Sequence, residues 1–417
     1  MASDTFRNPF RPGAGHAPPY LAGRSQEQEE IRVLLRQKEI TKNVVMTGLR
    51  GVGKTVLLDA FKPIAQEMGW LWATNDVGEA TSETEEMLAT RILTDIAIVT
   101  SALVVKETRQ IGFGFARQDR VITQPLNYDV LRDFYERTPG LVSDKLKACL
   151  EFVWNVLPQG AISGLVFAYD EAQNFADHAE DKQYPLALLL DVFQSIQKRG
   201  IPFMLVLTGL PTLPPRLVES RTFAERMFHT IFLKRLDDAD AREAIVRPID
   251  EADCPFEFDD NVVKRIVQIS GGYPYFIQFI CKEVFDAWIT KVGQGEYPRV
   301  PEAAIIRKLD ADFFHGRWAR ATDRQRDLLQ VIATLPNAEL EFSVQEVVEE
   351  SRQSLFKPFN QSHVSKMLKE LADAGLVYRN RWGKYSLAVP LMSQFIQRQT
   401  QIAANLKLRE GAPARYQ

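Results

Sequence analysis

Cysteine is scarce in this chain of 417 residues, which contains only three. Cys149, Cys254 and Cys281 lie far apart in the sequence and form no CxxC pair. An odd number of scattered thiols supports neither a disulfide framework nor a zinc site. We therefore expect the protein in a reducing, cytoplasmic environment.

Long hydrophobic runs and an excess of one charge are also missing. The longest apolar stretches, residues 96–105 and 201–211, are about half of the roughly 20 residues that a membrane-spanning helix needs. Residues 1–20 contain no apolar core followed by a cleavage site, so we expect no secretory signal and no membrane partner. The 51 basic and 54 acidic side chains leave a net charge of −3, which argues against a protein that coats nucleic acid along its whole length.

The composition that remains is typical of a globular protein, with 45% hydrophobic, 25% charged and 10% aromatic residues. A chain of this length is expected to fold as two or three domains. Proline and glycine are concentrated between residues 8 and 19, which predicts an extended arm. The patterns divide the chain into a flexible N-terminal arm (1–19), an α/β domain (20–236), a small helical domain (237–310), a C-terminal domain (311–400) and a tail (401–417).

Short apolar runs bounded by polar or turn residues predict a parallel sheet in the α/β domain. The apolar runs cover residues 43–47, 70–74, 165–169, 202–207 and 230–233. Helical patterns lie between them. Residues 81–127 are harder to interpret, and Gly112, Gly114 and nearby charges favour a long loop. In the C-terminal domain we expect helices at 323–333, 343–350 and 361–374, and then a two-stranded ribbon that turns at Gly383.

The segment GLRGVGKT, residues 48–55, matches the phosphate-loop pattern GxxxxGK[ST] in full. Its glycines let several backbone N–H groups point at one phosphate, Lys54 reaches the β and γ oxygens, and the Thr55 hydroxyl ligates magnesium. A plain glycine-rich turn is the alternative, but a predicted strand before the pattern and a helix after it favour phosphate binding. The pattern predicts ATP and Mg²⁺ as cofactors, with contacts from Gly48, Arg50, Gly51, Val52, Gly53, Lys54, Thr55 and Val56.

Two adjacent carboxylates follow the apolar run at 165–169. Asp170 suits the magnesium ion, usually through water, and Glu171 can polarise the attacking water. An acidic pair after a strand is more often a charge at a helix N-terminus, but the phosphate loop favours the catalytic interpretation. At the end of the run at 202–207, the Thr208 hydroxyl is placed to hold the water or the γ-phosphate, although a structural role is the alternative.

The phosphate loop, the segment LVFAYDE at 165–171 and the segment TGLP at 208–211, in this order, resemble the AAA+ and STAND superfamilies of P-loop ATPases. The most similar group is that of the archaeal ATPases and origin-recognition-like proteins. The resemblance covers about residues 20–395. It implies an α/β fold with a parallel P-loop sheet and helices on both faces, followed by a small helical lid and a C-terminal winged helix.

The resemblance also implies roles for residues outside these segments. Arg24, beside Gly23, is similar to the N-terminal nucleotide-binding box, and Pro274 ends a GYP segment that resembles the GxP turn of STAND proteins. An AAA+ lid commonly offers a sensor arginine where this chain has GGYPYF, residues 271–276, without an arginine. The family's arginine finger corresponds to Arg226, which would act in trans on a neighbour's ATP; a surface salt bridge is the alternative.

The C-terminal domain resembles a winged helix and carries a local excess of positive charge. Such a domain lays its third helix in the major groove and sets basic side chains against phosphates, although winged helices also dock proteins. The predicted contacts with double-stranded DNA are Lys366, Lys369, Arg379, Arg381 and Lys384.

These features favour an AAA+ type ATPase whose nucleotide state controls self-assembly, DNA engagement or both. We expect a homo-oligomer in the ATP state. The alternative is a STAND-like nucleotide switch in signalling or phage defence, which would act through a partner protein. The intact motif residues argue against a winged-helix regulator with an inert nucleotide fold.

Overall fold

The computed structural model describes residues 7–13, 15–78, 83–111, 118–158, 161–254, 256–292, 300–355, 357–381 and 383–410. Contacts within the chain define two compact units. We call residues 24–48 and 54–232 the sheet unit, and residues 1–23, 49–53 and 233–417 the helical unit.

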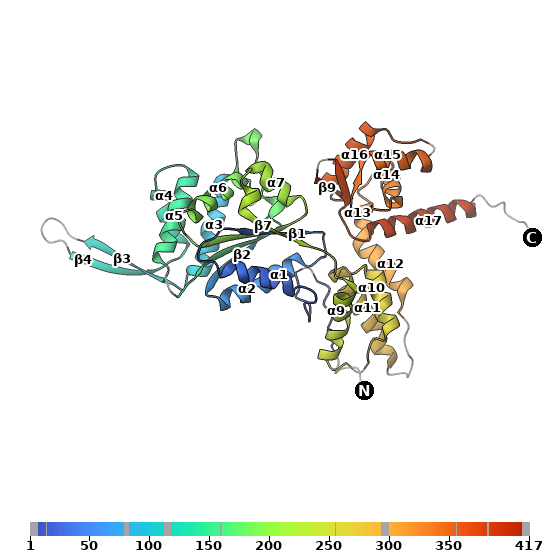
Figure 1. Ribbon diagram of the computed structural model, residues 1–417, viewed down its shortest axis with the longest axis horizontal. Coiled ribbons are helices and arrows are strands. Elements are labelled where there is room, and N and C mark those ends of the chain that lie inside the picture. Colours follow the sequence, from blue (N-terminus) through green and yellow to red (C-terminus); the bar gives the residue numbers. More distant parts are fainter. Residues whose placement is uncertain are drawn as a thin grey trace, which may run out of the picture. The chain divides into compact units, whose positions relative to one another are not determined.

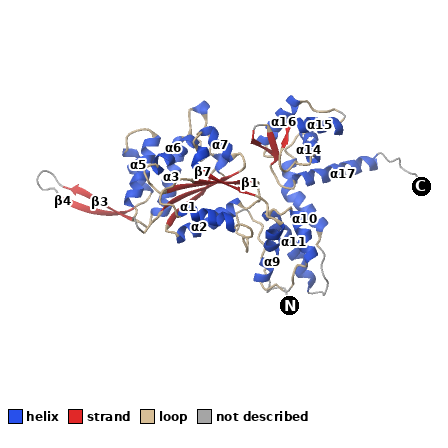
Figure 2. Ribbon diagram, viewed as in Figure 1, coloured by secondary structure: helices blue, strands red, loops and turns tan. Residues whose placement is uncertain are grey.

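Five strands form the central sheet, in the order β2-β5-β6-β1-β7 (Figures 1 and 2). The β2–β5, β5–β6 and β6–β1 pairs are parallel. Every residue of β1, β5 and β6 is buried, which explains why these strands are continuous apolar runs in the sequence. The expected parallel sheet is confirmed, with strands at Asn43–Gly48 (β1), Trp70–Asp76 (β2), Gly164–Asp170 (β5), Phe203–Gly209 (β6) and Phe228–Leu233 (β7).

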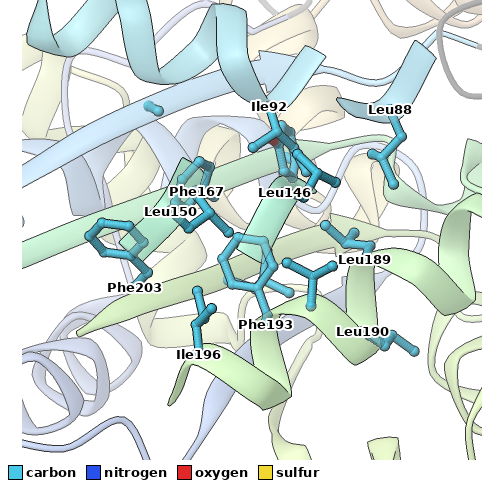
Figure 3. Close-up of a cluster of buried hydrophobic side chains, with 14 of the residues drawn as sticks. Leu88, Ile92, Leu146, Leu150, Phe167, Leu189, Leu190, Phe193, Ile196 and Phe203 are labelled. Atoms are coloured by element: carbon cyan, nitrogen blue, oxygen red, sulfur yellow. The ribbon is translucent and has the colours of Figure 1, made fainter. Parts of the chain in front are cut away.

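Helices cover both faces of this sheet, α1 and α2 on one face and α3, α5 and α6 on the other (Figure 1). Figure 3 shows the core of the second face, where Phe167 and Phe203 of the sheet meet Phe193 of α6. The rings of Phe167 and Phe193 pack edge to face with centroids 5.0 Å apart. Helices of the sheet unit span Ser25–Leu35 (α1), Lys54–Glu67 (α2), Glu85–Thr100 (α3), Tyr128–Arg137 (α4), Val142–Val156 (α5), Pro185–Gln197 (α6), Leu213–Ser220 (α7) and Ala224–Met227 (α8), with short 3₁₀ turns at Ala172–Asn174 (η2) and Ala179–Asp181 (η3).

The expectation of a long loop over residues 81–127 is wrong for most of that segment. It contains α3, whose first turn is capped by the Thr84 hydroxyl, and an antiparallel hairpin of β3 (Val104–Ile111) and β4 (Gln118–Pro125). This hairpin projects from the sheet unit (Figure 1). Gly112 and Gly114, on which the expectation depended, lie outside the described residues.

The helical unit begins with a helical lid, to which the N-terminal segment adds an aromatic side chain. Phe10 is buried and stacks on Phe258 with ring centroids 6.3 Å apart, and the Asn8 amide donates to the Lys282 carbonyl at 3.0 Å. Residues 8–10 are therefore held against the lid, whereas the sequence predicted a flexible arm. Lid helices span Asp238–Glu251 (α9), Asp260–Ser270 (α10), Pro274–Val292 (α11) and Glu302–Leu309 (α12), followed by a π-helical turn at Asp310–His315 (η4) and by Gly316–Trp318 (α13).

The C-terminal part of the helical unit has the topology of a winged helix, with three helices and a small antiparallel sheet in the order β8-β10-β9 (Figure 2). The three expected helices and the ribbon are present, and β8 adds a third strand. α17 continues beyond residue 400, the expected end of this domain. The elements are Asp323–Thr334 (α14), Phe342–Ser343 (β8), Val344–Ser354 (α15), Gln361–Asp373 (α16), Val377–Arg381 (β9), Lys384–Leu387 (β10) and Met392–Glu410 (α17). None of the helices in the described ranges is both long and apolar enough to cross a bilayer.

Candidate nucleotide-binding site

The phosphate loop joins the end of β1 to the start of α2, and two of its glycines are required by backbone conformation. Gly51 and Gly53 have φ angles of 78° and 91°, in the left-handed region that side-chain-bearing residues avoid. Lys54 is 8% exposed, and its ammonium group donates to the Gly48 carbonyl at 3.1 Å. The lysine therefore reaches back to the start of the loop, where the pattern predicts the phosphates.

Two predicted site residues from separate elements, Thr55 and Thr208, contact the carboxylate of a third, Asp170. The Thr55 hydroxyl, in the first turn of α2, donates to one oxygen of Asp170, and the Thr208 hydroxyl donates to the other. The backbone N–H of Glu171 donates to Asp170 as well, at 2.8 Å. Because β5 and β6 are neighbours in the sheet, their carboxyl ends bring Asp170 and Thr208 together.

The Thr55 hydroxyl and the Asp170 carboxylate fit a magnesium ion. Mg²⁺ prefers oxygen ligands, and in nucleotide sites it takes one or two from the protein and the others from phosphates and water. The described residues contain no group of three or more acidic, histidine or cysteine side chains that would hold a metal ion by themselves. Burial, and next the negative charge of Asp170, raises the pKa of Asp59 on α2.

Glu171 follows Asp170 and is exposed at the carboxyl end of β5. Its backbone is in the left-handed region, with a φ of 50°, where it precedes the short η2 turn. The amide nitrogen of Gln173 donates to the Glu171 carboxylate. Sequence analysis missed Gln173, because only its contacts in the folded structure distinguish it from the other glutamines of the chain.

The two arginines before β7 have different surroundings. Arg221 makes a two-point ion pair with Asp191, with N–O distances of 2.9 and 2.7 Å. Arg226 is exposed, and within the described part of the chain no carboxylate lies within 4.0 Å of its guanidinium group. Its backbone carbonyl accepts from Lys42 at 2.6 Å, which fixes the backbone and leaves the side chain exposed.

The remaining predicted nucleotide contacts fall into two groups. Arg24 is buried beside the start of α1 and lies 3.5 Å from Glu27. In the helical unit, Pro274 begins α11, and the N–H of the next residue, Tyr275, donates to the Gly51 carbonyl at 3.2 Å. The first turn of this lid helix therefore contacts the phosphate loop. Arg50 and Val56 are half-buried, and Val52 is buried.

The predicted DNA face lies on α16 and on the ribbon that follows it. Lys366 and Lys369 are exposed on α16, while Val364, Leu368 and Leu371 pack inward, as the helical period predicts. The Lys366 ammonium is 4.0 Å from Glu370, and that of Lys384 is 3.5 Å from Glu346, both as partly exposed ion pairs. Arg379 is exposed on β9, and the side chain of Arg381 lies outside the described residues.

Comparisons with known proteins agree with this architecture. A family model described as "Domain of unknown function (DUF8462)" matches residues 311–396. No curated protein sequence matches the chain.

Among solved structures, the chain is similar to a Walker-type ATPase of Pyrococcus abyssi, with a TM-score of 0.51 and 15% identity over 90% of this chain and 96% of that one. The ORC2 protein of Aeropyrum pernix in its ADP form gives a TM-score of 0.52 and 15% identity over 93% and 97%. The ORC1 protein of Aeropyrum pernix in complex with DNA gives a TM-score of 0.43 and 16% identity over 93% and 95%. The two structures with TM-scores above 0.5 show that the chain has the fold of AAA+ type P-loop ATPases, which confirms the expected fold class.

Proposed function

We propose that this protein binds and hydrolyses ATP. The observation that carries the proposal is the meeting of Thr55, Asp170 and Thr208 at the carboxyl edge of the sheet. The buried Lys54 ammonium lies at the start of the adjoining phosphate loop. A hydroxyl, a carboxylate and an ammonium group in this arrangement suit a magnesium-bound triphosphate.

Each residue has a distinct task in the proposed reaction. Lys54 offsets negative charge on the β and γ phosphates, and the backbone N–H groups of the glycine loop orient them. When bound, the magnesium ion supplies further positive charge to the phosphate oxygens. The exposed carboxylate of Glu171 accepts a proton from the water that attacks the γ-phosphorus, while the bond to the leaving oxygen breaks.

We further propose that a second copy of the chain completes the ATP site by contributing its Arg226. Its exposure and its lack of a carboxylate partner among the described residues support this role, since a paired arginine would first have to lose its partner. Arg221, the other arginine shortly before β7, already forms an ion pair with Asp191. The nucleotide state would thereby control self-assembly.

DNA engagement through the winged helix is the proposed output. The basic side chains of α16 and of the ribbon support it, because exposed lysines and arginines on such a domain are suited to phosphate contacts. The ion pairs of Lys366 with Glu370 and of Lys384 with Glu346 are partly exposed and therefore weak. DNA phosphates could therefore replace Glu370 and Glu346 as the partners of these lysines at a small cost in free energy.

A nucleotide switch that acts through a partner protein is the second candidate. Two observations favour it: the lid helix begins without an arginine, and its Tyr275 N–H contacts Gly51 of the phosphate loop. A lid held against the loop in this way is suited to retaining nucleotide. Sizing the protein with ADP and with a non-hydrolysable ATP analogue, with and without duplex DNA, separates the two candidates, because only the first predicts that ATP-dependent oligomers bind DNA.

The nucleotide site itself is tested by Lys54→Ala, with Lys62→Ala on the exposed face of α2 as the matched control. Lys54→Ala should abolish ATP binding and turnover, because it removes the loop's side-chain cation for the β and γ oxygens. The Lys62 variant should match the wild type in calorimetric binding and phosphate release. Wild-type affinity and turnover in Lys54→Ala would refute the site.

A further inference from the structure

Gln173 lies in the η2 turn after β5 and uses both ends of its side-chain amide. The amide nitrogen donates to the Glu171 carboxylate, and the amide oxygen accepts from the backbone N–H of Leu210 at 3.0 Å. Leu210 directly follows β6. One side chain therefore connects the proposed catalytic base to the end of the neighbouring strand.

The two partners determine how the amide is oriented. A backbone N–H can only donate, and an ionised carboxylate can only accept, so the oxygen of Gln173 must face Leu210 and its nitrogen must face Glu171. Glutamate in place of Gln173 would keep the acceptor and lose the donor. Asparagine would be shorter by one methylene group. Glutamine alone among these side chains provides both functions at this reach.

The surroundings of Gln173 support this bridge from two sides. Arg216 of α7 donates to the Gln173 backbone carbonyl. A Cβ atom on Gly209 would lie 2.6 Å from the Gln173 amide oxygen, so any other residue there would push the amide out of its present position. Gly209 therefore leaves the space in which the amide reaches Leu210.

We propose that Gln173 is a positioning residue that holds the Glu171 carboxylate at the ends of β5 and β6, where the attacking water must lie. The inference rests on the proposed ATPase function. Glu171 is exposed, and a side chain of this type would otherwise exchange among several rotamers. The segment from Thr208 to Leu210 holds Asp170 through its hydroxyl and Gln173 through its N–H. A displacement of the end of β6 would therefore move the Asp170 carboxylate through Thr208 and the Glu171 carboxylate through Gln173.

The decisive variant is Gln173→Glu, because it separates the two contacts of the amide. It keeps the acceptor for Leu210 but replaces the donor to Glu171 by a second negative charge. We expect kcat to fall about 10- to 100-fold, as for a catalytic group displaced by about 1 Å, while KM and ATP affinity change less than about twofold, since the phosphate contacts remain. Gln66→Glu, which makes the same change at an exposed position of α2, should leave kcat unchanged.

A second variant, Gln173→Ala, removes the amide without adding charge and should also lower kcat. Combined with Glu171→Gln, it should cause no further loss, because Gln173 acts only through Glu171. Circular dichroism and melting curves confirm that the compared variants are folded. A normal kcat in Gln173→Glu, or an equal additional loss in the Glu171→Gln background, overturns the positioning role. Full turnover in Glu171→Gln would refute Glu171 as the base and overturn the positioning role as well. Absent wild-type turnover instead refutes the proposed ATPase function.

Discussion

The hydroxyl of Thr208, at the end of β6, donates to the carboxylate of Asp170, at the end of the neighbouring strand β5. Both side chains are at least 95% buried, so little water competes for this contact. In the proposed site, Thr208 would connect the γ-phosphate or the attacking water with the magnesium ligand Asp170.

Thr208→Val tests this connection, because valine keeps the shape of threonine and removes the hydroxyl. We expect kcat to fall about 10-fold, in line with loss of a hydrogen-bond donor near the transition state, with ATP affinity nearly unchanged. Thr100→Val is the matched control, since the Thr100 hydroxyl is also buried and bonds to the backbone carbonyls of Ile96 and Leu126, away from the proposed site. The control should lose about 1 kcal/mol of stability and retain its kcat. Equal kcat values in the two variants would contradict the role of Thr208.

Arg226→Ala should retain ATP binding and lose turnover, because the proposed arginine finger would act on the ATP of a neighbouring chain. Mixing it with Lys54→Ala should restore part of the activity, since sites then form from an intact pocket on one chain and an intact Arg226 on the other. Phosphate release is measured over a range of protein concentrations. If the mixture releases no phosphate, and if wild-type turnover per chain does not change with protein concentration, action in trans is ruled out.

Arg221→Ala is the control for that experiment. It removes the ion pair with Asp191 and should reduce the melting temperature while leaving turnover per folded chain intact. Loss of turnover in this variant, with Arg226→Ala active, would exchange the roles of the two arginines.

Neutralising Arg379, Arg381 and Lys384 together to glutamine should weaken binding to duplex DNA and flatten its salt dependence. The slope of log K against log salt falls by about 0.9 for each phosphate contact removed. Fluorescence anisotropy across a salt series, in ADP and in the ATP analogue, measures it. ATP affinity should be unchanged.

Three exposed cations of the sheet unit provide a control with the same charge change: Arg132, Arg137 and Lys198. Replacing them by glutamine should leave the salt slope as in the wild type. If the two triple variants have the same slope, or if the wild type binds no DNA at low salt, the winged helix serves protein docking instead.

A buried carboxylate in α3 makes stability depend on pH in a defined direction. Burial raises the pKa of Asp95, and Arg91, 2.7 Å away, opposes that rise. Arg91→Ala should lower the free energy of unfolding by about 2 kcal/mol at pH 8. This loss is smaller than that for a fully buried ion pair, because Arg91 is partly exposed. The raised pKa means that the folded state takes up a proton more readily than the unfolded state as pH falls, so the cost should be smaller at pH 5.

Urea unfolding at the two pH values measures this difference. Arg132→Ala is the control, because its ion pair with Glu136 is exposed and worth little. An identical loss for Arg91→Ala at pH 5 and pH 8 would contradict an ionised Asp95 as the cause.

The sheet was predictable from sequence because burial on both faces makes its strands continuous apolar runs, as in residues 165–169. The β3–β4 hairpin was not, because its formation depends on pairing between the two strands, which no local pattern in either strand reveals. The phosphate loop and the acidic pair were recognisable as local patterns. Gln173 was not, since its partner Leu210 lies on another strand and nothing near either residue in the sequence indicates the contact.

Phe10 has a practical consequence for dividing this protein into fragments. The ring completes an apolar cluster in the lid by stacking on Phe258, although the two residues are far apart in sequence. An expression fragment that starts at residue 20, or an isolated lid cut at residue 237, would leave that side of Phe258 open to solvent. Such a truncation removes the Phe10 ring from the cluster, as a large-to-small core substitution would. It should lower the free energy of unfolding by about 3 kcal/mol. The lid is therefore a discontinuous module, and its boundaries in the sequence include residues 8–10.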